Sequence, residues 1–134
     1  MTETTADVAQ GVTGGPRLLL RLEGLTLFVG AVVAFSMTQQ PWWLFAALIL
    51  VPDLSMLGYL VGSRVGAVVY NAVHVTFGPI VLTVAGLLFG DLPVLGVAMI
   101  WLAHVGIDRA LGYGLKYGLG FGFTHLGRIG RSAV

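Results

Sequence analysis

Four long apolar runs, separated by short breaks, constrain the fold of this chain more than any other feature of its sequence. A helix needs about 20 mostly apolar residues to cross the roughly 30 Å hydrocarbon core of a membrane. The four runs cover residues 18–37, 42–61, 65–89 and 93–117, and Pro, Gly and polar residues lie between them. Because such short connections force neighbouring helices to run in opposite directions, the sequence predicts an antiparallel four-helix bundle.

The composition places this bundle in a lipid bilayer. Hydrophobic residues make up 57% of the 134 residues and charged residues only 10%, which lies outside the range of soluble domains. We therefore expect an all-α integral membrane protein. The sequence contains no Cys, which excludes disulfides, thiolate catalysis and Cys-ligated metals. It also lacks the basic patch interleaved with aromatic residues that would indicate nucleic-acid binding.

Basic residues predict the orientation of the bundle. Arg17 and Arg21 flank the first run and Arg64 lies in the second break, whereas the first and third breaks contain no Lys or Arg. Further basic residues follow the fourth run: Lys116, Arg128 and Arg131. Because positive residues stay on the cytoplasmic side, both termini are predicted to be cytoplasmic.

The two ends of the chain are expected to lie outside the bundle. Residues 1–16 are polar and are predicted to form a disordered tail. Residues 17–118 would form the bundle. Residues 119–134 alternate glycine with aromatic and basic residues, a pattern that cannot form a stable helix and is expected to lie at the cytoplasmic interface.

Polar side chains from all four predicted helices fall in one layer. At about 1.5 Å rise per residue they lie about 6 to 14 Å from the cytoplasmic face, and spacings of three, four and seven residues put those of each helix on one side. The layer contains Glu23, Asp53, Tyr70, Asn71, His74, His104 and Asp108. The outer halves of the runs carry no ionisable residue. We therefore predict a polar cavity that opens toward the cytoplasm beneath an apolar plug.

The free energy of burying these groups favours a functional role for the layer. An ionisable residue near mid-bilayer costs about 2.5 to 3.5 kcal/mol. Hydrogen bonds between membrane helices contribute only about 0.6 kcal/mol on average, and Ser, Thr or Asn would supply them at lower cost. Three acids cannot all ionise cheaply at low dielectric, so one is expected to stay protonated while another pairs with Arg109 or an imidazolium. Such a separation of acid and base is what proton-transfer catalysis requires.

The residues of the layer can be given roles on this hypothesis. Asp53 or Glu23 would donate a proton, and His104 with Asp108 would accept one. The full catalytic set is Asp53, His104, Asp108, Glu23 and His74. The predicted substrate-binding residues, which orient the substrate or stabilise a developing cation, are Tyr70, Asn71, Trp101, Arg109 and Tyr113.

Two further features of the layer have alternative interpretations. Pro52 deprives the carbonyl of Leu48 of its helical partner, which either opens backbone polarity to the cavity or only kinks the helix. His74, His104 and an acid would make a three-ligand metal set. Membrane di-iron enzymes carry many more histidines than the three in this sequence. The sequence is therefore interpreted as having no metal and no cofactor, and a single metal ion stays open as the alternative.

Three segments resemble the signature of an uncharacterised family of small bacterial four-helix membrane proteins that carries a domain of unknown function. They are YNAVH, WLAHVGIDRALGYGLKY and THLGRIGR, and the resemblance covers about Leu18 to Gly130. It implies a multi-pass protein of the bacterial inner membrane. The family offers no catalytic residues to carry over.

The leading hypothesis is a membrane-embedded enzyme that applies acid–base chemistry to a lipophilic, isoprenoid-like substrate, for example in a cyclisation, epoxide opening or isomerisation. One alternative is a proton- or ion-coupled carrier, since small multidrug exporters also have four spans with intramembrane acids. Another is an accessory protein that binds a partner helix or a cofactor. The oligomeric state is left open, and a homo-oligomer is compatible with all three.

Overall fold

The structure, a computed structural model, describes residue 4 and residues 10–130. The predictions that fall on residues 1–3, 5–9 and 131–134, Arg131 among them, lie outside the described residues. In chain order the elements are α2 (Gly14–Met37), α3 (Trp42–Leu48), the 3₁₀ helix η1 (Val51–Leu60), α4 (Ser63–His74), α5 (Phe77–Phe89), α6 (Leu92–Leu111), β1 (Phe123–Thr124) and β2 (Gly127–Arg128).

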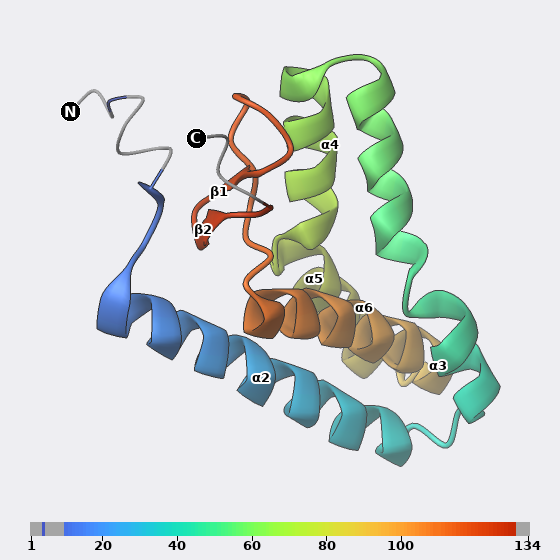
Figure 1. Ribbon diagram of the computed structural model, residues 1–134. Helices are drawn as coiled ribbons and strands as arrows, with labels where there is room; N and C mark the ends of the chain where they lie inside the picture. The colour runs from blue at the N-terminus through green and yellow to red at the C-terminus, as the bar shows by residue number, and fades with distance from the viewer. Residues whose placement is uncertain (1–3, 5–9, 131–134) are drawn as a thin grey trace.

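Four helical stretches are long and apolar enough to cross a membrane, which confirms the predicted all-α fold class. They are Gly14–Met37, Trp42–Leu60, Ser63–Phe89 and Leu92–Leu111. In Figure 1, α2 and α6 lie side by side and run in opposite directions, while α4 and η1 form a second pair that stands across the first. The first pair is close because of two glycines: a Cβ at Gly106 would lie 2.6 Å from the backbone nitrogen of Phe28, and one at Gly24 would lie 2.8 Å from the nitrogen of Ala110.

The second stretch is broken where Pro52 predicts a defect. Proline has no N–H to continue the helical ladder, and α3 accordingly ends at Leu48. The chain resumes as η1, in which the Asp53 N–H bonds to the carbonyl of Leu50 at 3.1 Å. The carbonyl of Ile49, which a continuous α-helix would pair with Asp53, is thereby left free for another donor.

The third stretch is also broken, although the sequence predicts one helix over 65–89. The α4 helix ends at His74, and Val75 is extended with ψ 151° before α5 begins at Phe77. Pro79 explains the break, because a proline cannot donate to the carbonyl four residues before it, here Val75. The chain turns sharply at this point (Figure 1), and His74 lies at the bend.

The last helix begins as predicted and ends earlier than predicted. Gly90 adopts a left-handed φ of 63°, and the side chain of Asp91 accepts a hydrogen bond from the Val94 N–H at 3.0 Å, so the predicted turn caps α6. The helix was expected to reach Tyr117, but it stops at Leu111 because Gly112 adopts φ 93°, a conformation that glycine tolerates and that ends helices.

The residues after α6 fold back on α4 as a short antiparallel hairpin. Phe123 pairs with Arg128, and Thr124 with Gly127. The side chain of Asn71 fixes this segment twice: its Nδ2 donates to the carbonyl of Lys116 at 2.8 Å, and its Oδ1 accepts from the Lys116 N–H at 2.6 Å. The Val12 N–H also donates to the carbonyl of His125 at 2.8 Å, so the two ends of the described chain meet on one side of the molecule.

The apolar core lies at the other end of α6. Phe35, Ala98, Met99 and Ile100 are buried there, and Phe35 packs edge-on against Phe45 at 5.2 Å between ring centroids. Ile100 is one helical turn from His104, so the polar residues of α6 lie between this core and the C-terminal hairpin.

Candidate functional site

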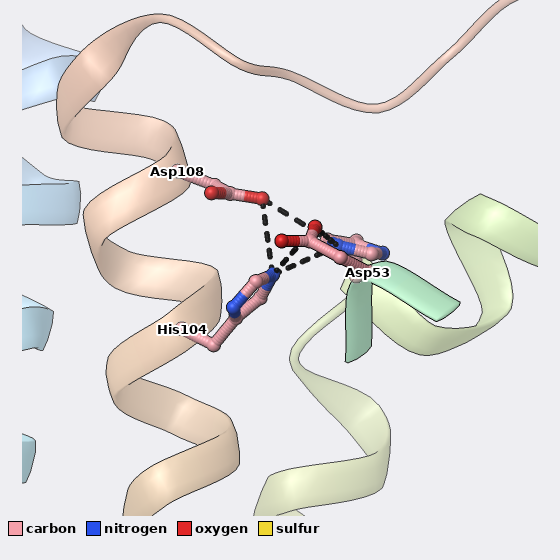
Figure 2. Close-up of side chains that lie close together, drawn as sticks. Asp53, His104 and Asp108 are labelled. Atoms are coloured by element: carbon pink, nitrogen blue, oxygen red, sulfur yellow. Dashed lines mark hydrogen bonds and ion pairs between the residues drawn. The ribbon is translucent and has the colours of Figure 1, made fainter. Parts of the chain in front are cut away.

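Four ionisable side chains meet between α6, α4 and η1. The Nε2 atoms of His74 and His104 are 3.1 Å apart. Oδ1 of Asp53 lies 3.6 Å from the first and 3.3 Å from the second, and Oδ2 of Asp108 lies 3.5 Å and 3.3 Å from the same two nitrogens. Figure 2 shows His104 and Asp108 projecting from one face of α6 toward Asp53. We call Asp53, His74, His104 and Asp108 the His–Asp cluster.

The breaks in two helices help to build this cluster. The free carbonyl of Ile49 accepts a hydrogen bond from Nδ1 of His104 at 2.6 Å. His74, at the last turn of α4, uses its Nδ1 to donate to the carbonyl of Tyr70 at 2.9 Å. Because a carbonyl oxygen can only accept, each ring carries a proton on Nδ1, and in its neutral form it turns a lone pair at Nε2 toward the centre of the cluster.

The cluster is buried on its histidine side and reachable on its carboxylate side. The two histidine residues are each 2% exposed. The side chain of Asp53 is 31% exposed and that of Asp108 is 16% exposed. A small molecule could therefore approach the carboxylates, while the imidazole rings are held by the protein.

Tyr70 and Lys116 cover the cluster on the side of the C-terminal hairpin. The Tyr70 ring stacks on His74 at 3.7 Å, and its hydroxyl donates to Oδ2 of Asp108 at 3.4 Å. The ammonium of Lys116 lies 4.7 Å from the Tyr70 ring centroid and 3.7 Å from that of Phe121. Burial lowers the pKa of Lys116 to about 8, although the charges of Asp108 and Asp53 oppose the shift. Sequence reasoning used Lys116 only as a marker of orientation and missed its place beside the site.

An apolar pocket lies next to the backbone segments that carry Asp53 and His74. It has a volume of about 530 Å³, within the range of small-molecule sites. Its wall includes Pro52, Val73, Ile100 and Trp101. Pro52 and Val73 directly precede Asp53 and His74 in the chain, so the pocket and the cluster share backbone.

Glu23 and Arg109, both predicted for the site, have no side-chain contact with the four cluster side chains among the described ion pairs and hydrogen bonds. They line a separate cavity of about 200 Å³ between α2 and α6. The reason is helical geometry: α2 packs on the face of α6 that carries Gly106, and two residues are about 200° of rotation from His104 at 3.6 residues per turn. Instead of pairing with an acid, Arg109 donates from Nη2 to the carbonyl of His74 at 3.4 Å.

The remaining predicted substrate-binding residues have varied positions. Trp101 lines the apolar pocket, where its Nε1 donates to the carbonyl of Val73 at 2.7 Å. Asn71 uses both ends of its amide to hold Lys116 and so serves the hairpin. Tyr113 lies beyond the end of α6 and is 43% exposed.

The arrangement supports two kinds of chemistry. Two carboxylates and two imidazoles within hydrogen-bonding reach can pass protons to and from a bound molecule. The same four side chains each present one ligand atom, and these atoms all lie within 4.8 Å of one another, so they could also hold a metal ion.

Fold and site together define a small all-α membrane protein with a buried His–Asp cluster beside an apolar pocket. The chain belongs to the family described as Domain of unknown function (DUF4260), whose model matches residues 17–129. This match confirms the predicted membership of an uncharacterised family. No curated protein and no solved structure matches the chain.

Proposed function

We propose that this protein is a membrane-embedded enzyme of the bacterial inner membrane that carries out acid–base chemistry on a lipophilic, isoprenoid-like molecule. The observation that carries the proposal is that Pro52 and Val73, which line the apolar pocket of about 530 Å³, directly precede Asp53 and His74 of the cluster in the chain. An apolar chamber selects an apolar molecule, and the adjacent cluster supplies the groups that transfer protons.

The residues of the cluster can act as separate proton donor and proton acceptor. Asp53 has the most exposed side chain of the four, and in its protonated form it would donate a proton to an alkene or an epoxide oxygen. The Nε2 lone pair of His104, oriented by Ile49 and flanked by Asp108, would accept a proton from the cation that results. The bonds formed and broken balance without an oxidant or reductant, so the reaction class is isomerisation, cyclisation or epoxide opening. The face of Trp101 in the pocket wall would stabilise the cation.

Turnover of a native lipid extract tests the proposal. The full chain is placed in nanodiscs with polyisoprenoid-containing lipids from the source cells, and untargeted mass spectrometry compares the lipids before and after incubation. We expect one lipophilic species to be consumed and an isomer or hydrate of it to form. His104→Ala should slow this conversion by about 100-fold or more, the usual contribution of a general base.

A matched carboxylate serves as the control for Asp53. Asp53→Asn should abolish turnover, whereas Asp91→Asn should retain it. Residue 91 lies in the turn before α6, where Asn caps a helix as well as Asp does. Full activity of Asp53→Asn would refute the role given to this residue. No change in any lipid with the unmodified protein would refute the proposed reaction.

A carrier is the second candidate, because two of the four apolar stretches are broken beside the cluster. Discontinuous helices often form the binding sites of secondary transporters. Uptake of a lipophilic cation into proteoliposomes against its gradient, driven by a pH difference and lost in Asp108→Asn, would favour this function over an enzyme.

A further inference from the structure

The hydrogen bonds of the His–Asp cluster leave its centre rich in electron pairs. Both imidazole Nδ1 atoms donate to backbone carbonyls, those of Tyr70 and Ile49. Both Nε2 atoms therefore carry lone pairs, and they face each other at 3.1 Å. The carboxylate oxygens of Asp53 and Asp108 face the same point. Four acceptors converge there, so a proton or a metal cation has to lie between them.

Protons satisfy this requirement poorly. A proton on each Nε2 would set two N–H groups against each other across 3.1 Å. A single proton shared by the two nitrogens compensates one carboxylate and leaves the other to the nearby charge of Lys116. A divalent cation can accept an electron pair from all four atoms at once, which one shared proton cannot do.

The spacing of the four atoms matches that of a small transition-metal site. Bonds of about 2.0 to 2.2 Å from nitrogen and oxygen to zinc, at tetrahedral angles, put neighbouring ligand atoms about 3.3 to 3.5 Å apart. The five distances that join a histidine nitrogen to another ligand atom run from 3.1 to 3.6 Å. The sixth edge, between the two carboxylate oxygens, is no longer than 4.8 Å.

The surroundings also resemble those of metal ligands in general. A metal-bound histidine usually donates its other N–H to a carbonyl or carboxylate, which fixes the ring and raises its basicity. Both histidines do so here, and His104 does so through the carbonyl that the break at Pro52 releases. The hydroxyl of Tyr70 likewise orients Asp108.

We propose that Asp53, His74, His104 and Asp108 bind one divalent transition-metal ion, with Zn²⁺ the best fit to their spacing. Two imidazoles favour a metal of this class over Mg²⁺ and Ca²⁺, which prefer oxygen ligands alone. The inference goes beyond the proposed function, because an ion held by all four side chains would occupy the Nε2 lone pair of His104 that the proton-transfer step uses, so that step belongs to the metal-free chain. Its test does not depend on turnover.

Metal content and affinity test the proposal directly. The full chain is purified in mild detergent, stripped with a chelator, and titrated with Zn²⁺, Co²⁺ or Mg²⁺. We expect about one Zn²⁺ per chain by mass spectrometry of the metal, a visible Co²⁺ spectrum typical of low coordination number, and no competition from Mg²⁺. Retention of less than about one ion in ten chains at stoichiometric Zn²⁺ would overturn the proposal and leave protons as the cations of the cluster.

Variants locate the ion. His74→Ala and His104→Ala should each weaken Zn²⁺ binding by at least about 100-fold. The isosteric Asp108→Asn should weaken it by at least about 10-fold, and it provides the test where a histidine variant fails to fold. His125→Asn is the matched histidine control: it keeps an acceptor for the Leu115 N–H and should retain the ion. Equal loss of Zn²⁺ in His125→Asn and His104→Ala would overturn the assignment.

The two proposals can fail separately. Zn²⁺ binding that depends on the cluster, with no lipid converted, would refute the enzyme and keep the metal site. Lipid conversion by a chain that fails to retain Zn²⁺ would refute the metal site and keep the enzyme.

Discussion

At the scale of single residues, Lys116 shows how closely the C-terminal segment is joined to the site. It is the only lysine of the sequence and is 4% exposed, with its ammonium between the rings of Tyr70 and Phe121. Burial lowers its pKa to about 8. Because the two rings contact the ammonium without accepting its protons in ordinary hydrogen bonds, the charge is held by cation–π attraction and by the nearby carboxylates.

The lowered pKa of Lys116 predicts a pH dependence of stability. Between about pH 8 and the usual lysine pKa near 10.4, the unfolded chain binds a proton here that the folded chain has lost. Stability should therefore rise with pH in this window and level off below it. We expect the thermal midpoint of the unmodified protein in detergent to rise by several degrees from pH 8 to pH 10 relative to that of Lys116→Met.

Arg128→Met provides the control for this measurement. It removes an exposed cation that stacks on Phe123 and does not titrate in the same range. Its pH profile should follow that of the unmodified protein. Parallel profiles for Lys116→Met and the unmodified protein would contradict the buried environment assigned to Lys116.

Residue spacing was enough to bring part of the site together. His104 and Asp108 are four residues apart on one helix, and depth along the helices matched them to Asp53 and His74. In the structure each of the two histidine nitrogens lies within 3.6 Å of both carboxylates. The depth of a residue along its helix does not show which neighbouring helix each side of α6 contacts. Glu23 has a matching depth, but the close contact at Gly24 and Gly106 turns it to the opposite face.

At the scale of elements, the two helix breaks matter most. Pro52 predicts the first break. The second follows from Pro79, which cannot donate a hydrogen bond to the carbonyl of Val75, four residues earlier. Because Val75 lies within a continuous apolar run, the sequence gives no other sign of this break. The C-terminal hairpin could not be predicted either, because its position depends on the paired hydrogen bonds between Asn71 and the backbone of Lys116. Long-range contacts of this kind leave no periodic pattern in a sequence.

Removing Pro52 is predicted to change the geometry of the His–Asp cluster without lowering the stability of the protein. In Pro52→Ala the α3 helix can continue, so that the Asp53 N–H recovers the carbonyl of Ile49 and Nδ1 of His104 loses its acceptor. We expect unchanged or slightly greater thermal stability. NMR spectra of ¹⁵N-histidine should lose the signal of the hydrogen-bonded Nδ1 proton of His104, and Zn²⁺ should bind the cluster about 10-fold more weakly.

Pro93→Ala is the matched control for this variant. Pro93 lies in the first turn of α6, where a helix does not need the missing N–H. It should leave the histidine spectrum unchanged. An unchanged spectrum in Pro52→Ala would show that the break does not create the acceptor for His104.

At the scale of the whole molecule, the chain ends and the basic residues agree on one orientation. Arg21 donates from Nε to the carbonyl of Ala110 at 2.8 Å, and Ser63 Oγ donates to the carbonyl of Gly118 at 2.9 Å. The start of α2, the turn before α4 and the segment after α6 thus lie on the same side. Positive residues concentrate on this side, and the positive-inside rule predicts that it faces the cytoplasm.

Because the sequence has no Cys, single cysteines can test this orientation without background. Thr13→Cys and Leu119→Cys report on the basic side, and Met37→Cys reports on the opposite end of α2, where Met37 is 74% exposed. In intact spheroplasts a membrane-impermeant maleimide should label Met37→Cys within minutes and should label the other two only after permeabilisation. Labelling of Thr13→Cys and Leu119→Cys in sealed spheroplasts would reverse the orientation, and the hairpin beside the His–Asp cluster would then face the periplasm.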